Sequence, residues 1–125
     1  MKLQQAIDRV DEVRPNMMSR DLKIDFLSEL DGLIWQEIVN KHEYDGEMPE
    51  MPAYDEDTDP GTALLVPFPY DNIYLYWLMA KIDEQTLEAE KYANDRQMFN
   101  ASYESYSDWY TRNHMPKTRV RELRL

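Results

Sequence analysis

The chain has 125 residues, of which 42% are hydrophobic and 31% charged, and its net charge at pH 7 is −11. This size and composition predict one globular domain with a real core and argue against wholesale disorder. The absence of cysteine excludes disulfides and thiolate metal sites, and the strong negative charge argues against DNA binding by the whole surface, because phosphates are repelled.

The first third of the chain predicts two helices. Apolar residues recur at helical spacing over residues 2–13, and Pro15 ends that helix because the residue before a proline is biased out of the helical region. Ser19 is a suitable N-cap for a second helix, whose broad apolar face continues to about His42. Gly32 lies inside this helix, where it lowers helix propensity, and suggests that another helix approaches closely.

A long acidic loop is predicted over residues 44–61, which contain three prolines and two glycines and show no helical or strand periodicity. No Lys or Arg occurs between Lys41 and Lys81. We expect the loop to face solvent and to repel other negative charges. Its candidate functional residues are Glu43, Asp45, Glu47, Glu50, Asp55, Glu56, Asp57 and Asp59. A short extended segment at 62–66 is expected to lead into the turn at Pro67-Phe68-Pro69.

Two further helices are predicted over about 70–84 and 87–113, and ten of the fifteen aromatic residues lie between Tyr70 and Tyr110. The third helix is apolar almost all round, which indicates a helix that is central to the domain or buried in an oligomer. The fourth has apolar residues on two flanks, which suggests neighbours on both sides. One flank consists of Tyr92, Phe99, Tyr103, Tyr106 and Tyr110, and the other of Met98, Ala101 and Trp109.

The predicted fold is therefore an all-α, single-domain bundle of about four helices, with the long acidic loop between helices two and three. The helical domain should span residues 1–116, and residues 117–125 should form a flexible basic C-terminal tail. The sequence has no apolar segment that suits a signal peptide or a membrane span, so no membrane partner is expected.

Several short runs stand out along the helices: Leu27-Ser28-Glu29-Leu30-Asp31-Gly32, Glu37-Ile38-Val39, Leu65-Val66-Pro67, Pro69-Tyr70-Asp71, Tyr74-Leu75-Tyr76, Ala80-Lys81-Ile82-Asp83, Tyr92-Ala93-Asn94, Met98-Phe99-Asn100-Ala101 and Asp108-Trp109-Tyr110-Thr111-Arg112-Asn113-His114-Met115-Pro116. Together they resemble the helices of head-tail connector (head-completion or adaptor) proteins from long-tailed bacteriophages and prophages. The resemblance covers nearly the whole chain and rests on structural residues.

This resemblance implies an all-helical virion protein that forms a homo-oligomeric ring below the portal, through which DNA passes without specific binding. The implied partners are the portal protein and other neck and tail proteins. The implied location is the neck of the virion, after assembly in the host cytoplasm. The acidic loop would then line the channel, and candidate interface residues are Tyr74, Trp77, Met98, Trp109, Arg119, Arg121, Leu123 and Arg124. The basic tail is expected to dock on an acidic surface of a neighbouring subunit or of the portal; a disordered, solubilising end is the alternative.

The main alternative is an acidic inhibitor that mimics DNA and occupies a DNA-binding enzyme. The unbroken run of carboxylates favours it, whereas their clustering in a proline-rich loop argues against an ordered array that resembles phosphates. No acid, base or nucleophile constellation is visible, and the connector family has no catalytic motif, so neither enzymatic activity nor a cofactor is expected.

The remaining candidate sites have simpler interpretations. Asp55, Asp57 and Asp59 have the spacing of the first ligands of a calcium loop, but Pro60 replaces the required glycine, so no metal site is expected. His42 and His114 lie at helix ends without a second histidine at ligand spacing, which favours capping roles. Asp83 is expected to be solvated on a polar helix face.

Overall fold

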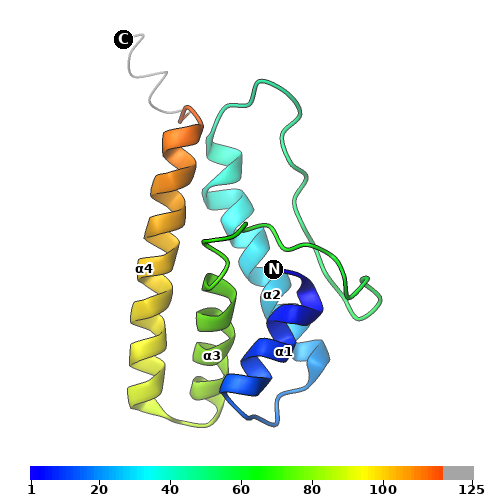
Figure 1. Cartoon of the computed structure of the whole chain (residues 1–125), viewed down its shortest axis with the longest axis vertical. Helices are drawn as coiled ribbons and strands as arrows, with labels where there is room; N and C mark the ends of the chain where they lie inside the picture. Colours follow the sequence, from blue (N-terminus) through cyan, green and yellow to red (C-terminus); the bar gives the residue numbers. More distant parts are fainter. Residues whose placement is uncertain (117–125) are drawn as a thin grey trace.

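The computed structural model describes residues 1–116, and the predicted basic tail at 117–125 lies outside the described residues. The described part contains four α-helices and one 3-10 turn, and no β-strand (Figure 1). In chain order these are α1 (Leu3–Val13), α2 (Arg20–Glu37), the 3-10 turn η1 (Val39–Lys41), α3 (Ile73–Gln85) and α4 (Ala89–Asn113). The predicted all-α bundle is thus confirmed.

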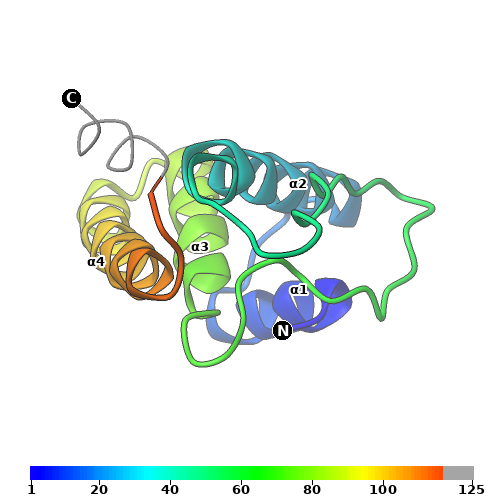
Figure 2. The same ribbon diagram turned by 90° about the horizontal axis from the view of Figure 1, so that it is seen from above.

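Helix α3 lies at the centre of the bundle, with α4 on one side and α1 and α2 on the other (Figure 2). This position explains why α3 is apolar almost all round, since three neighbours cover it. Tyr74 and Trp77 are only 0% and 7% exposed. The prediction that these two residues join subunits is therefore wrong, because the fold buries both side chains in the core of the same chain.

Helix α2 begins as predicted but ends earlier. The Oγ of Ser19 accepts a hydrogen bond from the backbone N–H of Leu22 at 3.1 Å, which confirms the N-cap. The helix ends at Glu37, and the chain tightens into η1, which buries Val39 in the core. The segment that approaches Gly32 closely is the loop and not a second helix. A Cβ at this position would lie 3.1 Å from the Cε of Met51.

Residues 43–72 connect η1 to α3 without regular secondary structure apart from one isolated bridge, and run down the side of the bundle (Figure 1). The connection is attached at several points. The indole N–H of Trp35 donates to the carbonyl of Pro49 at 2.7 Å, and the backbone N–H of Tyr54 donates to the Oγ of Ser28 at 2.9 Å. Near its end, the backbone N–H of Leu3 donates to the carbonyl of Thr62 at 2.9 Å. The segment therefore follows a defined path despite its irregular sequence.

The turn between α3 and α4 contains a strained residue. Leu87 has a φ of 58°, and its side chain is 88% exposed. The backbone N–H of Glu88 donates to the carbonyl of Asp83 at 3.0 Å, which is the closing bond of a Schellman motif. Glycine usually occupies the left-handed position of this motif because it has no Cβ to clash. Leucine has no evident packing role here that would offset this cost.

Replacing Leu87 with glycine is expected to raise the free energy of unfolding by about 0.5–1 kcal/mol, because the left-handed conformation costs glycine nothing. Loss of the exposed side chain should matter little. Urea unfolding, monitored by the far-UV circular dichroism of the helices, measures the effect. Leu87→Ala is the matched control, since it removes the side chain but keeps the strain. An equal gain in both variants would show that strain is not the cause.

Candidate functional site

An open groove lies between the start of the α3 helix and the middle of α4. We call it the hairpin groove; it has a volume of about 330 Å³, and the residues that line it include Pro69, Tyr70, Tyr76, Met98, Ala101 and Ser105. Met98 is 40% exposed, and Phe68, next to the groove in the sequence, is 84% exposed. A large aromatic side chain so far out of the core is suited to burial against another protein.

Packed aromatic rings support one wall of the hairpin groove. The rings of Tyr70 and Trp109 lie 5.3 Å apart, and Tyr106 lies 5.9 Å from Trp109 and 6.1 Å from Tyr70. Tyr106 is almost fully buried, so this cluster connects the groove to the core. Such ring pairs have preferred geometries that restrict their motion. The groove is therefore a preformed surface.

The residues predicted to form an interface fall into three groups. Met98 lines the hairpin groove, and Trp109 is partly buried behind it. Tyr74 and Trp77 are core residues. The predicted tail residues Arg119, Arg121, Leu123 and Arg124 lie outside the described part of the chain. The sequence analysis does not single out Phe68, although its position between two prolines indicates a turn, and turns run over the protein surface.

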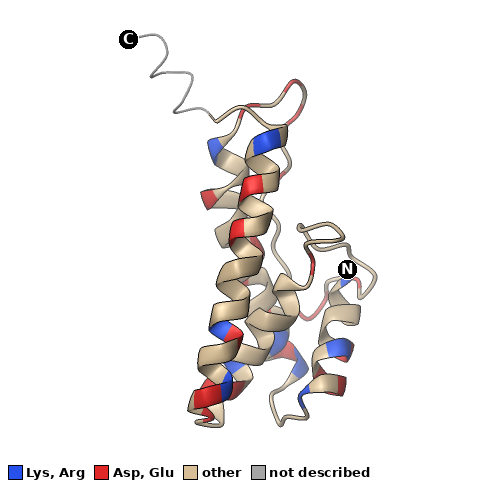
Figure 3. Ribbon diagram, turned by 60° about the vertical axis from the view of Figure 1, so that its left-hand side comes forward, with Lys and Arg blue, Asp and Glu red and all other residues tan. Residues whose placement is uncertain are grey.

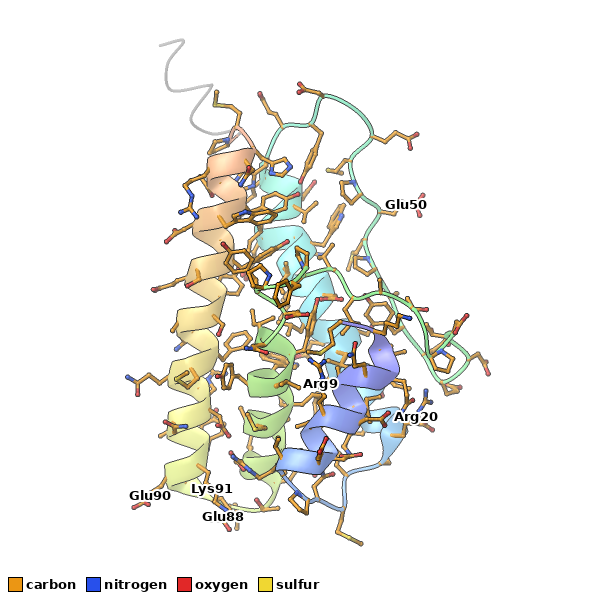
Figure 4. The ribbon with its side chains drawn as sticks, in the orientation of Figure 1. Arg9, Arg20, Glu50, Glu88, Glu90 and Lys91 are labelled. Carbon is orange, nitrogen blue, oxygen red and sulfur yellow. The ribbon has the colours of Figure 1, made fainter. Side chains whose placement is uncertain are left out.

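The eight candidate carboxylates of the acidic loop are all exposed. Glu50 points away from the bundle (Figure 4), and acidic residues mark the loop and the upper half of α4 (Figure 3). Asp55 and Asp59 also shape the backbone: the Oδ1 of Asp55 accepts from the N–H of Asp57 at 2.9 Å, and that of Asp59 accepts from the N–H of Gly61 at 2.8 Å. These aspartates act as turn-forming residues.

A buried polar cluster fastens the acidic loop to the core. Asp31, in the middle of α2, is fully buried. Its carboxylate accepts from the hydroxyls of Tyr54 at 2.6 Å and Tyr74 at 2.7 Å, and from the backbone N–H of Leu65 at 3.0 Å. Burial raises the pKa of Asp31, and the hydrogen bonds from Tyr54 and Tyr74 partly oppose that shift. One carboxylate thus joins α2, α3 and two points of the connection over residues 43–72.

A second buried cluster lies at the other end of the bundle, where α1, α3 and α4 meet. The guanidinium of Arg14 donates to Asp83 and, at 3.1 Å, to Asp95. Asp83 and Asp95 are 1% and 2% exposed. The expectation that Asp83 is a solvated surface residue is therefore wrong, because it faces the junction between helices. Burial, followed by the hydrogen bond with the carboxyl of Asp83, raises the pKa of Asp95 to about 6.

The two histidines, far apart in the sequence, meet at the top of the bundle. Their ring centroids are 6.3 Å apart, and the ring of His114 stacks on Tyr110 at 4.1 Å. The Nδ1 of His42 binds the carbonyl of Ile38, and that of His114 binds the carbonyl of Tyr110, each four residues earlier. Both therefore satisfy backbone carbonyls at helix ends, in agreement with the predicted capping roles.

Within residues 1–116, no three His, Asp or Glu side chains are arranged to hold a metal ion. None of the described helices combines the length and the apolar character needed to cross a bilayer. Searches of family models, curated proteins and solved structures return no match to this chain.

Proposed function

We propose that this chain is a subunit of a head-tail connector, which forms a ring on the portal and allows DNA to pass during head completion and tail attachment. The observation that carries the proposal is the hairpin groove. It lies on the helical hairpin whose sequence resembles the connector family, and Met98, Tyr70 and Tyr76 line it. Phe68, 84% exposed, directly precedes its lining residues Pro69 and Tyr70 in the sequence. A structural protein that joins neighbours needs such a surface and needs no catalytic cleft.

The contact would be formed by a few apolar anchors. Aromatic side chains and methionine are enriched at the centres of protein interfaces, where full burial gives them large contributions to binding. Phe68 can be buried without cost to the monomer core, because it contributes almost nothing to that core. The partner in this proposal is the portal or the adjacent subunit on the portal.

The acidic loop has a separate role in this proposal. Its eight exposed carboxylates face away from the core, and no Lys or Arg interrupts the sequence between Lys41 and Lys81. If the loop faces the channel of the ring, it repels the phosphates of the passing DNA and keeps the duplex from adhering. Repulsion of this kind requires charge density at the channel wall and requires no specific contact with DNA.

The proposal is tested by sedimentation of the chain mixed with the portal protein encoded in the same genome. The wild-type chain should co-sediment with the portal. The double variant Phe68→Ser/Met98→Ser should lose at least tenfold in affinity, since two buried anchors contribute about 1.5–3 kcal/mol each. Met17→Ser is the control, because Met17 is 100% exposed at a site distant from the groove along the chain. Co-sedimentation that the double variant leaves unchanged would exclude the hairpin groove as the interface.

A second proposal, the DNA-mimic inhibitor, gains support from one observation. The loop is attached to the bundle at Pro49 and Tyr54, and Leu65 is attached just beyond its end, so the backbone that carries its carboxylates follows a defined path. This weakens the sequence-based objection that a proline-rich loop cannot present an ordered array. Inhibition of a host nuclease at equimolar chain, abolished by neutralising the loop carboxylates and insensitive to Phe68→Ser, would favour this function over the connector.

A further inference from the structure

A second groove lies between α2 and the acidic loop, and we call it the loop groove. It has a volume of about 400 Å³, and its walls come from one face of α2 and from residues 51–54. The lining residues that matter here are Asp25, Glu29, Gly32, Leu33, Met51 and Tyr54. The loop groove is distinct from the hairpin groove, because the two have no lining residue in common.

The loop groove combines an apolar floor with an acidic rim. Leu33 and Met51 are 42% and 49% exposed, so the floor is open to a ligand. Asp25 and Glu29 are exposed on the α2 side, and Glu50 and Asp55 are exposed in the adjoining loop. Lys and Arg are absent from its described lining. A ligand that matches this surface carries both apolar side chains and positive charge.

The walls of the loop groove are held in place before any ligand binds. The hydrogen bonds from Tyr54 to Ser28 and Asp31, and from Trp35 to Pro49, attach the loop wall to α2 on both sides of Met51. Gly32 permits this close spacing, because a side chain there would press on Met51. A preformed site spares a ligand the cost of ordering the loop.

The chain itself contains a segment of the matching chemistry. Residues 117–125 carry four basic residues, one acidic residue and the apolar side chains of Val120, Leu123 and Leu125. The rest of the chain is strongly negative, so this segment is the chain's one concentration of positive charge. Its alternating basic and apolar residues suit an acidic rim and an apolar floor.

The segment is also tethered within reach of the loop groove. The described chain ends beside the start of the acidic loop, where the N–H of Glu43 donates to the carbonyl of Met115 at 2.8 Å and Pro116 forms a bridge with His42. Gln36, which lines the groove, precedes His42 by only six positions. Nine extended residues span about 30 Å, whereas the stretch of chain from His42 back to Asp25 is about 25 Å long at a helical rise per residue.

We propose that residues 117–125 bind in the loop groove of the same chain, with their arginines against the acidic rim and their leucines on Leu33 and Met51. The tether favours the same chain over a second copy, because a short linker produces an effective concentration in the millimolar range. This inference does not rest on the connector proposal, since any function of the chain is compatible with it. It assigns the basic tail an acidic surface of the same chain as its partner.

The test uses the full chain and the absence of native cysteine. Glu122→Cys introduces one thiol into the segment and leaves its basic and apolar residues intact, so a nitroxide can be attached there. The nitroxide broadens the amide signals of nearby residues. Signals from Ser28, Gly32 and Ala53 should be broadened several-fold more than those from Ala101 and Ser105 on α4. Raising the salt to about 1 M, where the Debye length is about 3 Å, should reduce this difference.

Two variants separate the groove from general charge attraction. Neutralising the rim with Asp25→Asn/Glu29→Gln in the spin-labelled chain should remove most of the selective broadening. The matched variant Glu104→Gln/Asp108→Asn removes two exposed carboxylates from α4 and should leave it unchanged. Equal broadening of the groove and α4 signals would overturn the proposal. A second control mixes spin-labelled chains without isotope with isotope-enriched chains without the label. Selective broadening that occurs only in this mixture would also overturn the proposal, because the segment would then occupy the groove of a second copy.

Discussion

Asp31→Ala is expected to lower the free energy of unfolding by at least about 3 kcal/mol, because it leaves several buried donors without an acceptor. The carboxylate of Asp31 accepts from two tyrosine hydroxyls and from the backbone of Leu65, and all three contacts are inside the fold. The substitution also leaves a cavity between α2, α3 and the loop. Urea unfolding at pH 7, monitored by the far-UV circular dichroism of the helices, measures the loss in the free energy of unfolding.

Tyr54→Phe is the matched control for Asp31→Ala. It removes the donor at 2.6 Å from Asp31 but leaves the other two hydrogen bonds of the carboxylate in place. We expect this variant to lose only about 1 kcal/mol, which is the typical contribution of one hydrogen bond. If both variants were equally destabilised, Asp31 would not be the centre of the cluster. Protease cleavage within residues 43–72 should increase in Asp31→Ala, since that segment loses two of its attachments.

The helices could be predicted from the sequence because each has a periodic apolar face, and α2 also has a capping serine. Their roles could not be inferred in the same way. The aromatic pattern of α3 is equally compatible with a central helix and with an oligomer interface, and only the packing of three neighbours shows that Tyr74 and Trp77 are buried. An apolar residue is a sign of burial, but the sequence does not show which surface buries it.

The polar clusters were missed for a related reason. Asp31 lies one position from Gly32 on an otherwise amphipathic helix, and its partners are 23, 34 and 43 residues away. The helical pattern predicts Asp83 on a solvated face, whereas Arg14, 69 positions away in the sequence, binds its carboxylate. Helical spacing shows which residues share a face. Helical spacing does not reveal a hydrogen-bond donor far away in the sequence that makes burial of a carboxylate possible.

The exposure of the candidate surface residues is predictable in part, while their roles at an interface or a channel wall stay predictions. The acidic residues of the loop are exposed, as a solvent-facing role requires, and Met98 lines an open groove. The attachments of the loop could not be predicted, because its prolines and carboxylates have no helical or strand periodicity. The side chains that hold the loop, Trp35, Ser28 and Asp31, all lie on α2. These attachments also create the loop groove.

Arg14→Met should destabilise the fold by about 3 kcal/mol or more at pH 8, because two buried carboxyl groups lose the cation that compensates them. Asp83 and Asp95 are almost fully buried, and Arg14 is the cation that binds both. The same variant should lose less at pH 5, where protonation relieves the repulsion between the carboxyl groups. Urea unfolding at the two pH values measures the difference.

The pH dependence follows from the raised pKa of Asp95. Its carboxyl has a pKa of about 6 in the folded protein, against about 3.9 for an aspartate in an unfolded chain. The folded state thus binds the proton more tightly. This group's stabilising contribution is complete below about pH 4 and is lost as the pH rises through about 6. The wild-type chain should therefore lose stability from this cluster between pH 4 and pH 7.

Asp95→Asn removes that dependence, because an amide has no proton to lose in this range. Its oxygen can still accept from Arg14, and its N–H₂ group can donate to Asp83, whose Oδ2 otherwise lacks a donor in the described structure. Asp95→Asn should therefore match or exceed the wild type at pH 8, and it should restore part of the stability lost in Arg14→Met when the two are combined. A wild-type pH profile that Asp95→Asn leaves unchanged would show that another group carries the titration. Additive effects in the double variant would show that Arg14 and Asp95 do not act together.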